Sequence, residues 1–232
     1  MIKRYSIGTS IAALRKRYNA SLPKKYRPII NAGVKKMLPI LTRKTPKEFN
    51  LYSWGMIPEE SHDSQIGEKL LNARVETLKA KQPFCDILNN RCLIPADGFY
   101  VWQNNDETES PFRAILPSRE TFSIIGLYTE WGEDEEEFAS IVKSFTMITT
   151  EGNQSMNNYS TRMPLLIPRS MEQQWLIGAN FDNMISKAIA YSKERSFELY
   201  AVSEHINNEK NNQVKFIQNI DHTLPGQTLS LF

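Results

Sequence analysis

Segments with the composition of β-strands recur from residue 97 onward and constrain the fold more than any other feature. Residues 97–103 (DGFYVWQ), 121–131 (TFSIIGLYTEW) and 141–150 (IVKSFTMITT) are rich in the β-branched and aromatic side chains that strands favour. Shorter strands are expected at NLYSWGMIP, RCLIP and ELYAVS, and helices at PFCDILNN, SMEQQWLI and the tract ending near residue 193. Many strands with few dispersed helices, and no repeat or low-complexity linker, predict one α+β domain over residues 1–232.

The composition sets aside several classes of protein. No apolar run approaches the ~20 residues of a membrane span, and the N-terminus lacks the continuous apolar stretch of a secretory signal. Cys85 and Cys92 are too few for a disulfide framework or a metal site, and Cys92 fits a buried small side chain better than a nucleophile. His62, His205 and His222 have no metal-ligand spacing. We therefore expect a cytoplasmic protein with no metal, no cofactor and no membrane partner.

Charge is segregated along the chain. Residues 1–47 hold thirteen Lys and Arg and no Asp or Glu, whereas the remainder holds 15 basic and 26 acidic side chains. Such segregation fits either a positive face for a polyanion or a solvated basic segment. An organelle transit peptide is disfavoured because Pro23, Pro28 and Pro39 interrupt any long amphipathic helix.

Local signals organise this basic segment and the acidic run that follows later. Residues 9–19 are predicted to form a short amphipathic helix that begins at Ser10, with Arg15, Lys16 and Arg17 exposed. An irregular, Pro-rich stretch is expected from there to about residue 48. The acidic run GEDEEE, residues 132–137, is expected to be a solvated hairpin tip, with a protein-binding surface as the weaker alternative.

Four polar-aromatic tracts do not have the composition of an ordinary core. They are SWGMIP (53–58), NARVET (72–77), PADGFYVW (95–102) and NNYSTRMP (157–164). In this order they resemble the WGLIP, NARxE, RCLIPxxGFYEW and HxRMP signatures of the SRAP proteins, the SOS response-associated peptidases that process abasic sites. The tail VSEHINNEKNN is similar to the family's closing segment, so the resemblance extends from residue 1 to about residue 220.

The resemblance implies a mostly antiparallel, barrel-like sheet surrounded by short helices. It also implies binding of single-stranded DNA, recognition of abasic sites and a DNA-protein crosslink as part of the DNA damage response. In the family an N-terminal cysteine reacts with the ring-opened aldehyde, and an asparagine, a glutamate and a histidine assist proton transfer. The chemistry explains these residue types. The α-amine of the cysteine reacts with the aldehyde to give a reversible imine, the neighbouring thiolate closes a ring that traps this imine, and the other three residues assist the proton transfers.

This sequence departs from the family pattern at the catalytic positions. Ile2 stands where the cysteine is expected, Val101 replaces the glutamate and Ser160 replaces the histidine, so that of the four only the asparagine is retained, as Asn72. Ile2 is also too bulky for normal removal of Met1. The substitutions predict a member deficient in catalysis, and whether the chain is an enzyme stays open, because another nucleophile is the alternative.

The remaining motif residues fit binding. Arg4, Arg74 and Arg162 stand where the resemblance implies phosphate contacts, although surface ion pairs would explain them as well. Trp54 and Trp102 either stack on bases or belong to the core. Asn153, Met163 and Pro164 flank the site. Glu76 either orients Arg74 or faces solvent.

Two hypotheses about function follow from these residues. The first is a noncovalent reader of single-stranded DNA with a preference for abasic sites or junctions. The second is a residual enzyme, in which the α-amine of Met1 forms a transient Schiff base with an abasic aldehyde and promotes strand cleavage by β-elimination.

Overall fold

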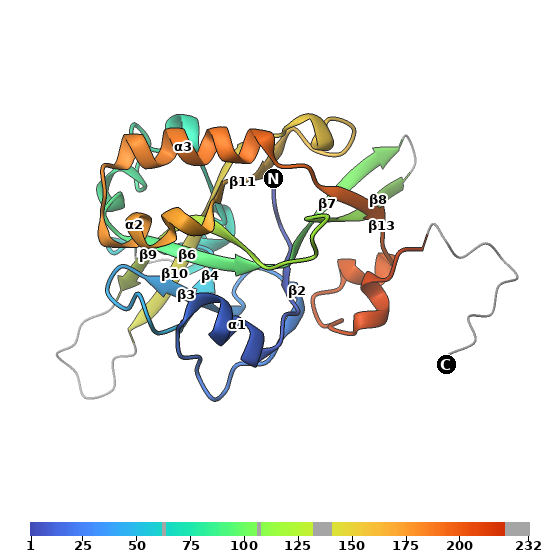
Figure 1. The fold of residues 1–232 in the computed structure, drawn as a ribbon, viewed down its shortest axis with the longest axis horizontal. Helices are drawn as coiled ribbons and strands as arrows, with labels where there is room; N and C mark the ends of the chain where they lie inside the picture. Colours follow the sequence, from blue (N-terminus) through green and yellow to red (C-terminus); the bar gives the residue numbers. More distant parts are fainter. Residues whose placement is uncertain (62–63, 106–107, 132–140, 221–232) are drawn as a thin grey trace, which may run out of the picture.

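A closed barrel of five strands forms the centre of the structure (Figure 1). The computed structural model describes residues 1–61, 64–105, 108–131 and 141–220. Around the barrel the strands follow the order β10, β4, β3, β6 and β9, and β9 pairs again with β10. These strands are β3 (Met37–Thr42), β4 (Asn50–Trp54), β6 (Arg91–Ala96), β9 (Phe122–Trp131) and β10 (Val142–Glu151).

Three short strands extend this sheet. β5 (Asn72–Arg74) and β11 (Arg162–Pro164) both pair with β10, and β12 (Leu166–Ile167) pairs with β9. Most pairs are antiparallel, whereas β4 and β5 run parallel to β10. The pairing brings the segment around Asn72 beside the segment around Arg162, although the two are far apart in sequence.

A second, five-stranded sheet lies beside the barrel in the order β13, β8, β7, β1 and β2. Its strands are β1 (Tyr5–Ile7), β2 (Ile29–Ala32), β7 (Gly98–Asn105), β8 (Thr108–Ile115) and β13 (Glu198–Ala201). One cluster of buried side chains joins the two sheets, and within it the rings of Tyr5 and Trp54 meet edge to face with centroids 5.0 Å apart. The division of the chain into domains stays a prediction.

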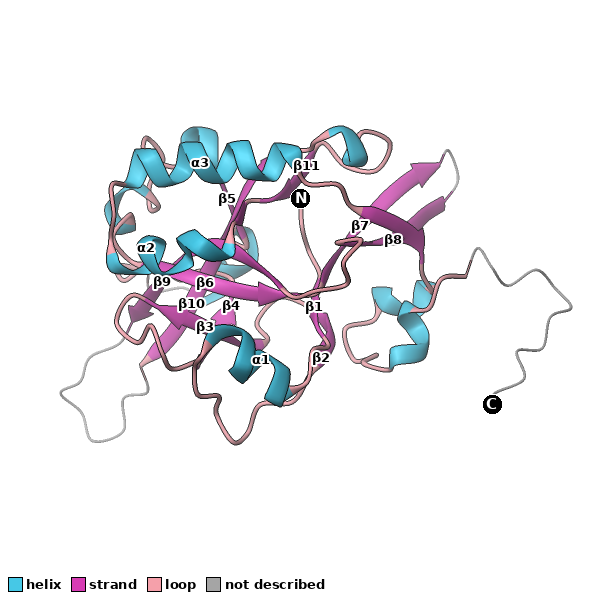
Figure 2. Cartoon of the chain, viewed as in Figure 1, coloured by secondary structure: helices cyan, strands magenta, loops and turns pink. Residues whose placement is uncertain are grey.

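In the described part of the chain, three α-helices flank the sheets (Figure 2). They are α1 (Ile11–Tyr18), α2 (Glu172–Ile177) and α3 (Phe181–Glu194). Ser10 caps α1 as predicted, since its Oγ accepts a hydrogen bond from the Ala13 N–H at 3.2 Å. Arg15 and Lys16 are exposed, but Arg17 is not: it pairs with Glu172 and only 18% of its side chain is accessible. Among the described residues no helix is both long and apolar enough to cross a bilayer.

The strands predicted at NLYSWGMIP, RCLIP, DGFYVWQ, TFSIIGLYTEW, IVKSFTMITT and ELYAVS are confirmed. The irregular stretch predicted up to residue 48 is wrong, because it contains β2 and β3. Pro39 is tolerated in β3 because β6 joins that strand only from Leu41 onward. The helix expected at PFCDILNN is only a single 3₁₀ turn, Cys85–Ile87, and the acidic run 132–137 lies outside the described residues.

Candidate functional site

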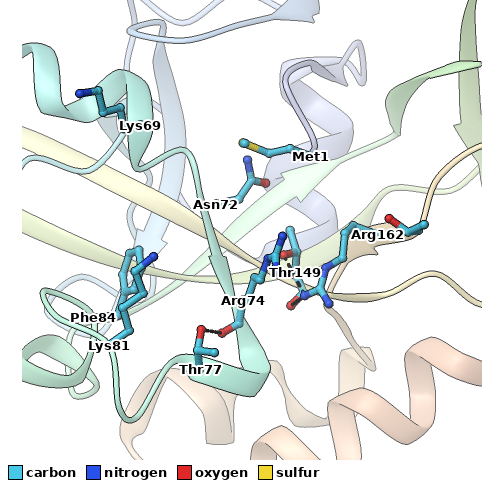
Figure 3. A pocket seen from close by; sticks show the side chains of 10 residues that line it. Met1, Lys69, Asn72, Arg74, Thr77, Lys81, Phe84, Thr149 and Arg162 are labelled. Carbon is cyan, nitrogen blue, oxygen red and sulfur yellow. Dashed lines mark hydrogen bonds between the residues drawn. The ribbon is translucent and has the colours of Figure 1, made fainter. Parts of the chain in front are cut away.

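The first residues of the chain lie at the centre of the candidate site. The Met1 side chain is exposed, whereas Ile2 is completely buried. Asn72 Nδ2, from β5, donates a hydrogen bond of 2.7 Å to the carbonyl oxygen of Ile2, and Asn72 Oδ1 is buried without a hydrogen-bond partner among the described residues. The retained asparagine thus holds the backbone of residue 2 and keeps one unpaired acceptor beside Met1 (Figure 3).

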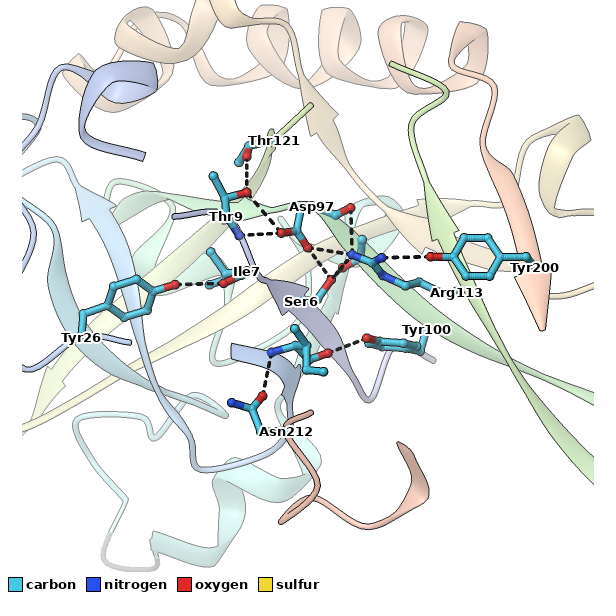
Figure 4. A network of polar contacts seen from close by, with 12 residues as sticks. Ser6, Ile7, Thr9, Tyr26, Asp97, Tyr100, Arg113, Thr121, Tyr200 and Asn212 are labelled. Atoms are coloured by element: carbon cyan, nitrogen blue, oxygen red, sulfur yellow. Dashed lines mark hydrogen bonds and ion pairs between the residues drawn. The ribbon is translucent and has the colours of Figure 1, made fainter. Parts of the chain in front are cut away.

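A buried polar network fixes β1, the strand that follows these residues (Figure 4). Asp97 accepts hydrogen bonds from Ser6 Oγ at 2.6 Å and from the Thr9 N–H at 2.8 Å, and it forms a 3.0 Å ion pair with Arg113. Arg113 also donates to the Tyr200 hydroxyl at 2.9 Å. Because Asp97 belongs to the tract PADGFYVW, this motif positions the N-terminus as well as forming the start of β7.

A pocket of ≈ 330 Å³ opens beside Met1 and Asn72 (Figure 3). Its lining includes Phe84, Thr77, Thr149 and Thr161, and no Asp or Glu of the described residues lines it. Four cationic side chains line the same pocket: Lys69, Arg74, Lys81 and Arg162. Cations gathered in a pocket without a lining carboxylate favour an anionic ligand.

The two arginines of this pocket differ in their partners. Arg162 donates to both carboxylate oxygens of Glu76, at 2.8 and 3.0 Å, and to the carbonyl oxygen of Thr149 at 2.8 Å. Partial burial raises the pKa of Glu76, but the hydrogen bond and charge of Arg162 outweigh it, so that the pKa is lowered overall. Arg74 is exposed and forms no ion pair with a carboxylate in the described part of the chain. Glu76 therefore pairs with Arg162, and not with Arg74, which was one of the two alternatives given for it from the sequence.

The α-amino group of Met1 lies in an unfavourable place for a positive charge. Burial, together with the nearby charges of Lys3, Arg162 and Arg74, lowers the pKa of this amine. The uncharged, nucleophilic fraction of this amine at a given pH is therefore larger than for an ordinary α-amine.

A second pocket, of ≈ 200 Å³, lies on another side of Met1. Val101 and Ser160 line it, so the two substituted positions do come together at the N-terminus as the motifs imply. The Ser160 hydroxyl donates to the carbonyl oxygen of Arg162 at 2.8 Å, and therefore serves the local turn. The remaining lining residues are Lys3, Trp102, Glu109 and Tyr159.

Glu109 is a site residue that the sequence analysis missed. It lies on β8, at the register position opposite Asn104 of β7, and it is the carboxylate that shares a pocket with Met1 in the described part of the chain. Recognition of residues 108–115 as the partner strand of 97–103 would have placed it there. Neither Cys85 nor Cys92 lines these two pockets, and complete burial raises the pKa of the Cys92 thiol.

Several residues expected at the DNA-binding site are buried or hydrogen-bonded within the protein. Trp54 is fully buried and its Nε1 donates to the Leu71 carbonyl oxygen at 3.0 Å, so it is not available for stacking on a base. Met163 and Pro164 are buried as well. Asn153 Nδ2 donates to the carbonyl oxygens of Ser192 and Arg195 and ties the chain to the end of α3.

Arg4 and Trp102 also have partners within the protein. Arg4 forms an ion pair of 2.8 Å with Glu209, and only 14% of its side chain is exposed. This ion pair gives Arg4 a partner within the protein, and the phosphate contact expected for Arg4 stays a prediction. Trp102 is half-buried, and its Nε1 donates to Asn207 Oδ1 at 2.8 Å. Trp102 also lines the smaller pocket at Met1.

The described residues contain no group of three or more His, Cys, Asp and Glu side chains arranged to hold a metal ion. The four cations of the larger pocket would repel a metal cation, and the charge there suits an anion instead.

Comparisons with known proteins identify the family. A model of the family described as SOS response associated peptidase (SRAP) matches residues 1–209. The abasic site processing protein YoqW of Bacillus subtilis (strain 168) is 33% identical over 198 residues, which cover 84% of this chain and 87% of the relative. YoaM, an abasic site processing protein of the same organism, is 33% identical over 203 residues, covering 85% and 88%. HMCES, the abasic site processing protein of Xenopus tropicalis, is 23% identical over 220 residues, covering 81% and 65%.

Two solved structures have the same fold. A protein from Bacteroides thetaiotaomicron matches with a TM-score of 0.80 at 20% identity, over 93% of this chain and 98% of that one. A protein from Bordetella bronchiseptica matches with a TM-score of 0.72 at 21% identity, over 87% and 99%. The α+β, mostly antiparallel fold expected from the motifs is thus confirmed. The family model and the Bacillus subtilis relatives show that the chain belongs to the SRAP, or SOS response associated peptidase, family.

Proposed function

We propose that this chain binds single-stranded DNA that carries abasic sites, in response to DNA damage, and that it does so without forming the family's durable crosslink. The observation that carries the proposal is the pocket beside Met1, with four cationic side chains and no lining carboxylate among the described residues. The matched Bacillus subtilis and Xenopus tropicalis relatives are named abasic site processing proteins, which supports DNA as the ligand.

Each part of the pocket has a role in this proposal. Arg74, Lys69 and Lys81 are exposed cations that contact phosphates, with Arg74 able to use its planar fork. Asn72 Oδ1, buried and unpaired among the described residues, accepts a hydrogen bond from a hydroxyl of the abasic sugar. Trp102 offers an aromatic edge to a neighbouring base in the smaller pocket.

The absence of a durable crosslink follows from the thiol chemistry. Ring closure on an imine requires a thiolate close to the reacting amine, and residue 2 is a fully buried isoleucine. Cys85 and Cys92, the two cysteines of the chain, line neither pocket at Met1. An imine formed at this site would therefore remain reversible.

The test uses single-stranded DNA with and without one abasic site, on native and on denaturing gels, each with and without borohydride. The proposal expects a native shift that is absent from the denaturing gel in both borohydride conditions. A band that survives denaturation without borohydride would show that another nucleophile has replaced the cysteine. Absence of any native shift would contradict DNA binding itself.

A second candidate is a Schiff-base lyase, and the lowered pKa of the Met1 amine favours it. The uncharged amine attacks the aldehyde carbon of the abasic sugar, the carbinolamine loses water, and an imine forms that acidifies the neighbouring carbon. In this candidate Glu109, which lines a pocket with Met1, accepts the proton from that carbon, and the C–O bond to the 3′ phosphate breaks as the phosphate leaves with the electron pair.

This candidate predicts an adduct seen on the denaturing gel only after borohydride reduction. Acetylation of the α-amine, verified by intact mass, must abolish that adduct while the native shift persists. A borohydride adduct that survives acetylation would assign the reaction to a lysine side chain instead.

A further inference from the structure

A second positive surface lies on the segment that contains α1. Six exposed cations belong to it: Arg15 and Lys16 on α1, Lys24, Lys25 and Arg27 in the loop before β2, and Lys47 in the loop before β4. We call this group the α1 surface. None of its members lines the pocket beside Met1.

The loops of the α1 surface are held in place by the fold. The Ser21 N–H donates to the Lys47 carbonyl oxygen at 3.0 Å, and the Phe49 N–H donates to the Ser21 carbonyl oxygen at 2.9 Å. The buried Tyr26 hydroxyl donates to the Ile7 carbonyl oxygen at 3.1 Å and anchors the loop to β1. These contacts hold the backbone that carries the cations in place, so that less backbone entropy is lost when a ligand binds.

The charges of the α1 surface are not neutralised within the described part of the chain. Other cations of the first 47 residues form ion pairs, as in Arg4–Glu209, Arg17–Glu172 and Lys35–Glu68. In contrast, the described residues contain no carboxylate that forms an ion pair with a member of the α1 surface. Glu48 is the acidic residue adjacent to it in sequence, so the surface keeps a clear net positive charge.

The α1 surface and the elements that carry the pocket lie in different parts of the molecule. Figure 1 shows α1 and the loop that follows it at the lower edge, whereas the N-terminus and β11 lie above the barrel. Figure 2 shows β5, which carries Asn72 and Arg74, in the same upper region. A strand of nucleic acid held in the pocket would have to run past the barrel to reach α1.

We propose that the α1 surface is a second contact for the sugar-phosphate backbone of the same DNA, outside the pocket. This inference rests on the proposed function. Lys and Arg without carboxylate partners contribute affinity by displacing counterions from phosphates, irrespective of base sequence. An anionic membrane fits less well, because a membrane-binding helix exposes large apolar side chains, whereas α1 buries Leu14 and exposes Ala12 and Ala13.

The experiment compares two triple variants that remove the same charge. One is Lys16→Gln/Lys24→Gln/Lys25→Gln in the α1 surface. The control is Lys187→Gln/Lys193→Gln/Lys210→Gln, three exposed lysines on α3 and near the C-terminal 3₁₀ turns. Binding is measured by fluorescence anisotropy over a salt series with two oligonucleotides that both carry one abasic site. One is just long enough to fill the pocket, and the other is several times longer.

The α1 variant is expected to bind the short strand as the wild type does and the long strand more weakly. Its slope of log affinity against log salt on the long strand falls by about 2, since each lost phosphate contact on a single strand removes about 0.7. Equal losses in both variants, or no loss on the long strand, overturn the inference. Loss of binding to anionic phospholipid vesicles with unchanged DNA binding would assign the surface to a membrane instead. If the wild type does not bind the short strand, the proposed pocket is contradicted. The α1 surface is then tested by the long-strand comparison alone.

Discussion

Removal of the Asp97 carboxylate gives the sharpest test of how the fold holds the N-terminus. The side chain is only 13% exposed and faces Arg113, whose side chain is 11% exposed. Asp97→Ala leaves the guanidinium buried with the Tyr200 and Ser6 hydroxyls as its remaining side-chain partners. It also removes the acceptor for the Thr9 N–H.

The expected cost follows from the burial of this pair. Removal of one partner of a buried, hydrogen-bonded ion pair costs about 3–5 kcal/mol, because the other charge stays desolvated. With a urea m-value of about 3 kcal/mol/M, the unfolding midpoint should fall by roughly 1–2 M. Asp97→Ala/Arg113→Met removes both charges and should lose less stability than the single Asp97→Ala variant.

The assay is urea unfolding followed by tryptophan fluorescence and by circular dichroism, so that two probes test the two-state assumption. A loss below about 1 kcal/mol for Asp97→Ala would refute the reasoning, because such a value is typical of an exposed pair. A double variant less stable than Asp97→Ala would likewise show that the two charges do not depend on each other.

Further variants test the site itself. Glu76→Gln is expected to raise the affinity for single-stranded DNA several-fold in anisotropy titrations, because it frees Arg162 for phosphate; a lower affinity would mean that Glu76 positions Arg162 for binding. For the second candidate, the Schiff-base lyase, borohydride trapping at Met1 should increase with pH through a midpoint below the value of roughly 8 of an ordinary α-amine, because burial and nearby cations favour the uncharged form; a midpoint at or above that value contradicts the lowered pKa. Trp54→Ala truncates the core and should lower the free energy of unfolding in urea by about 3–5 kcal/mol. Trp102→Ala should weaken DNA binding with a smaller loss of stability. A larger loss of stability in Trp102→Ala than in Trp54→Ala would exchange the roles of the two residues.

Much of the fold could be predicted from local composition, because most strands have the β-branched and aromatic content of a half-buried surface. The closure of the barrel could not. It depends on β10, which pairs with both β9 and β4, and these pairings join segments distant in sequence. β2 and β3 were missed because prolines and lysines hide the pattern of short strands in the basic segment.

The candidate site could be predicted only through the motifs. Their order implies that Asn72, Val101 and Ser160 meet at the N-terminus. Asn72 lines the larger of the two pockets at Met1, and Val101 and Ser160 line the smaller one. The hydrogen-bond partners of the polar side chains could not be predicted from the sequence. Glu76 and Arg162, for example, are 86 positions apart. Glu109 was missed because its strand was not recognised.

Trp54 illustrates a different limit of the motifs. Gly55 beside it has a φ of +118°, and a Cβ there would lie 2.6 Å from the backbone oxygen of Gly67. The Trp-Gly pair therefore serves a buried turn in which only glycine fits. A motif shows that residues matter but does not separate those that support the site from those that touch the ligand.

The central claim is that the cationic pocket beside Met1 binds the phosphates of single-stranded DNA. The most direct test is the salt dependence of affinity for a short abasic oligonucleotide, in the wild type and in Arg74→Gln, with Lys187→Gln as the matched control. We expect a steep loss of affinity with salt in the wild type and a slope smaller by about 0.7 in Arg74→Gln only. A flat salt dependence, or the same slope in all three proteins, would contradict the central claim.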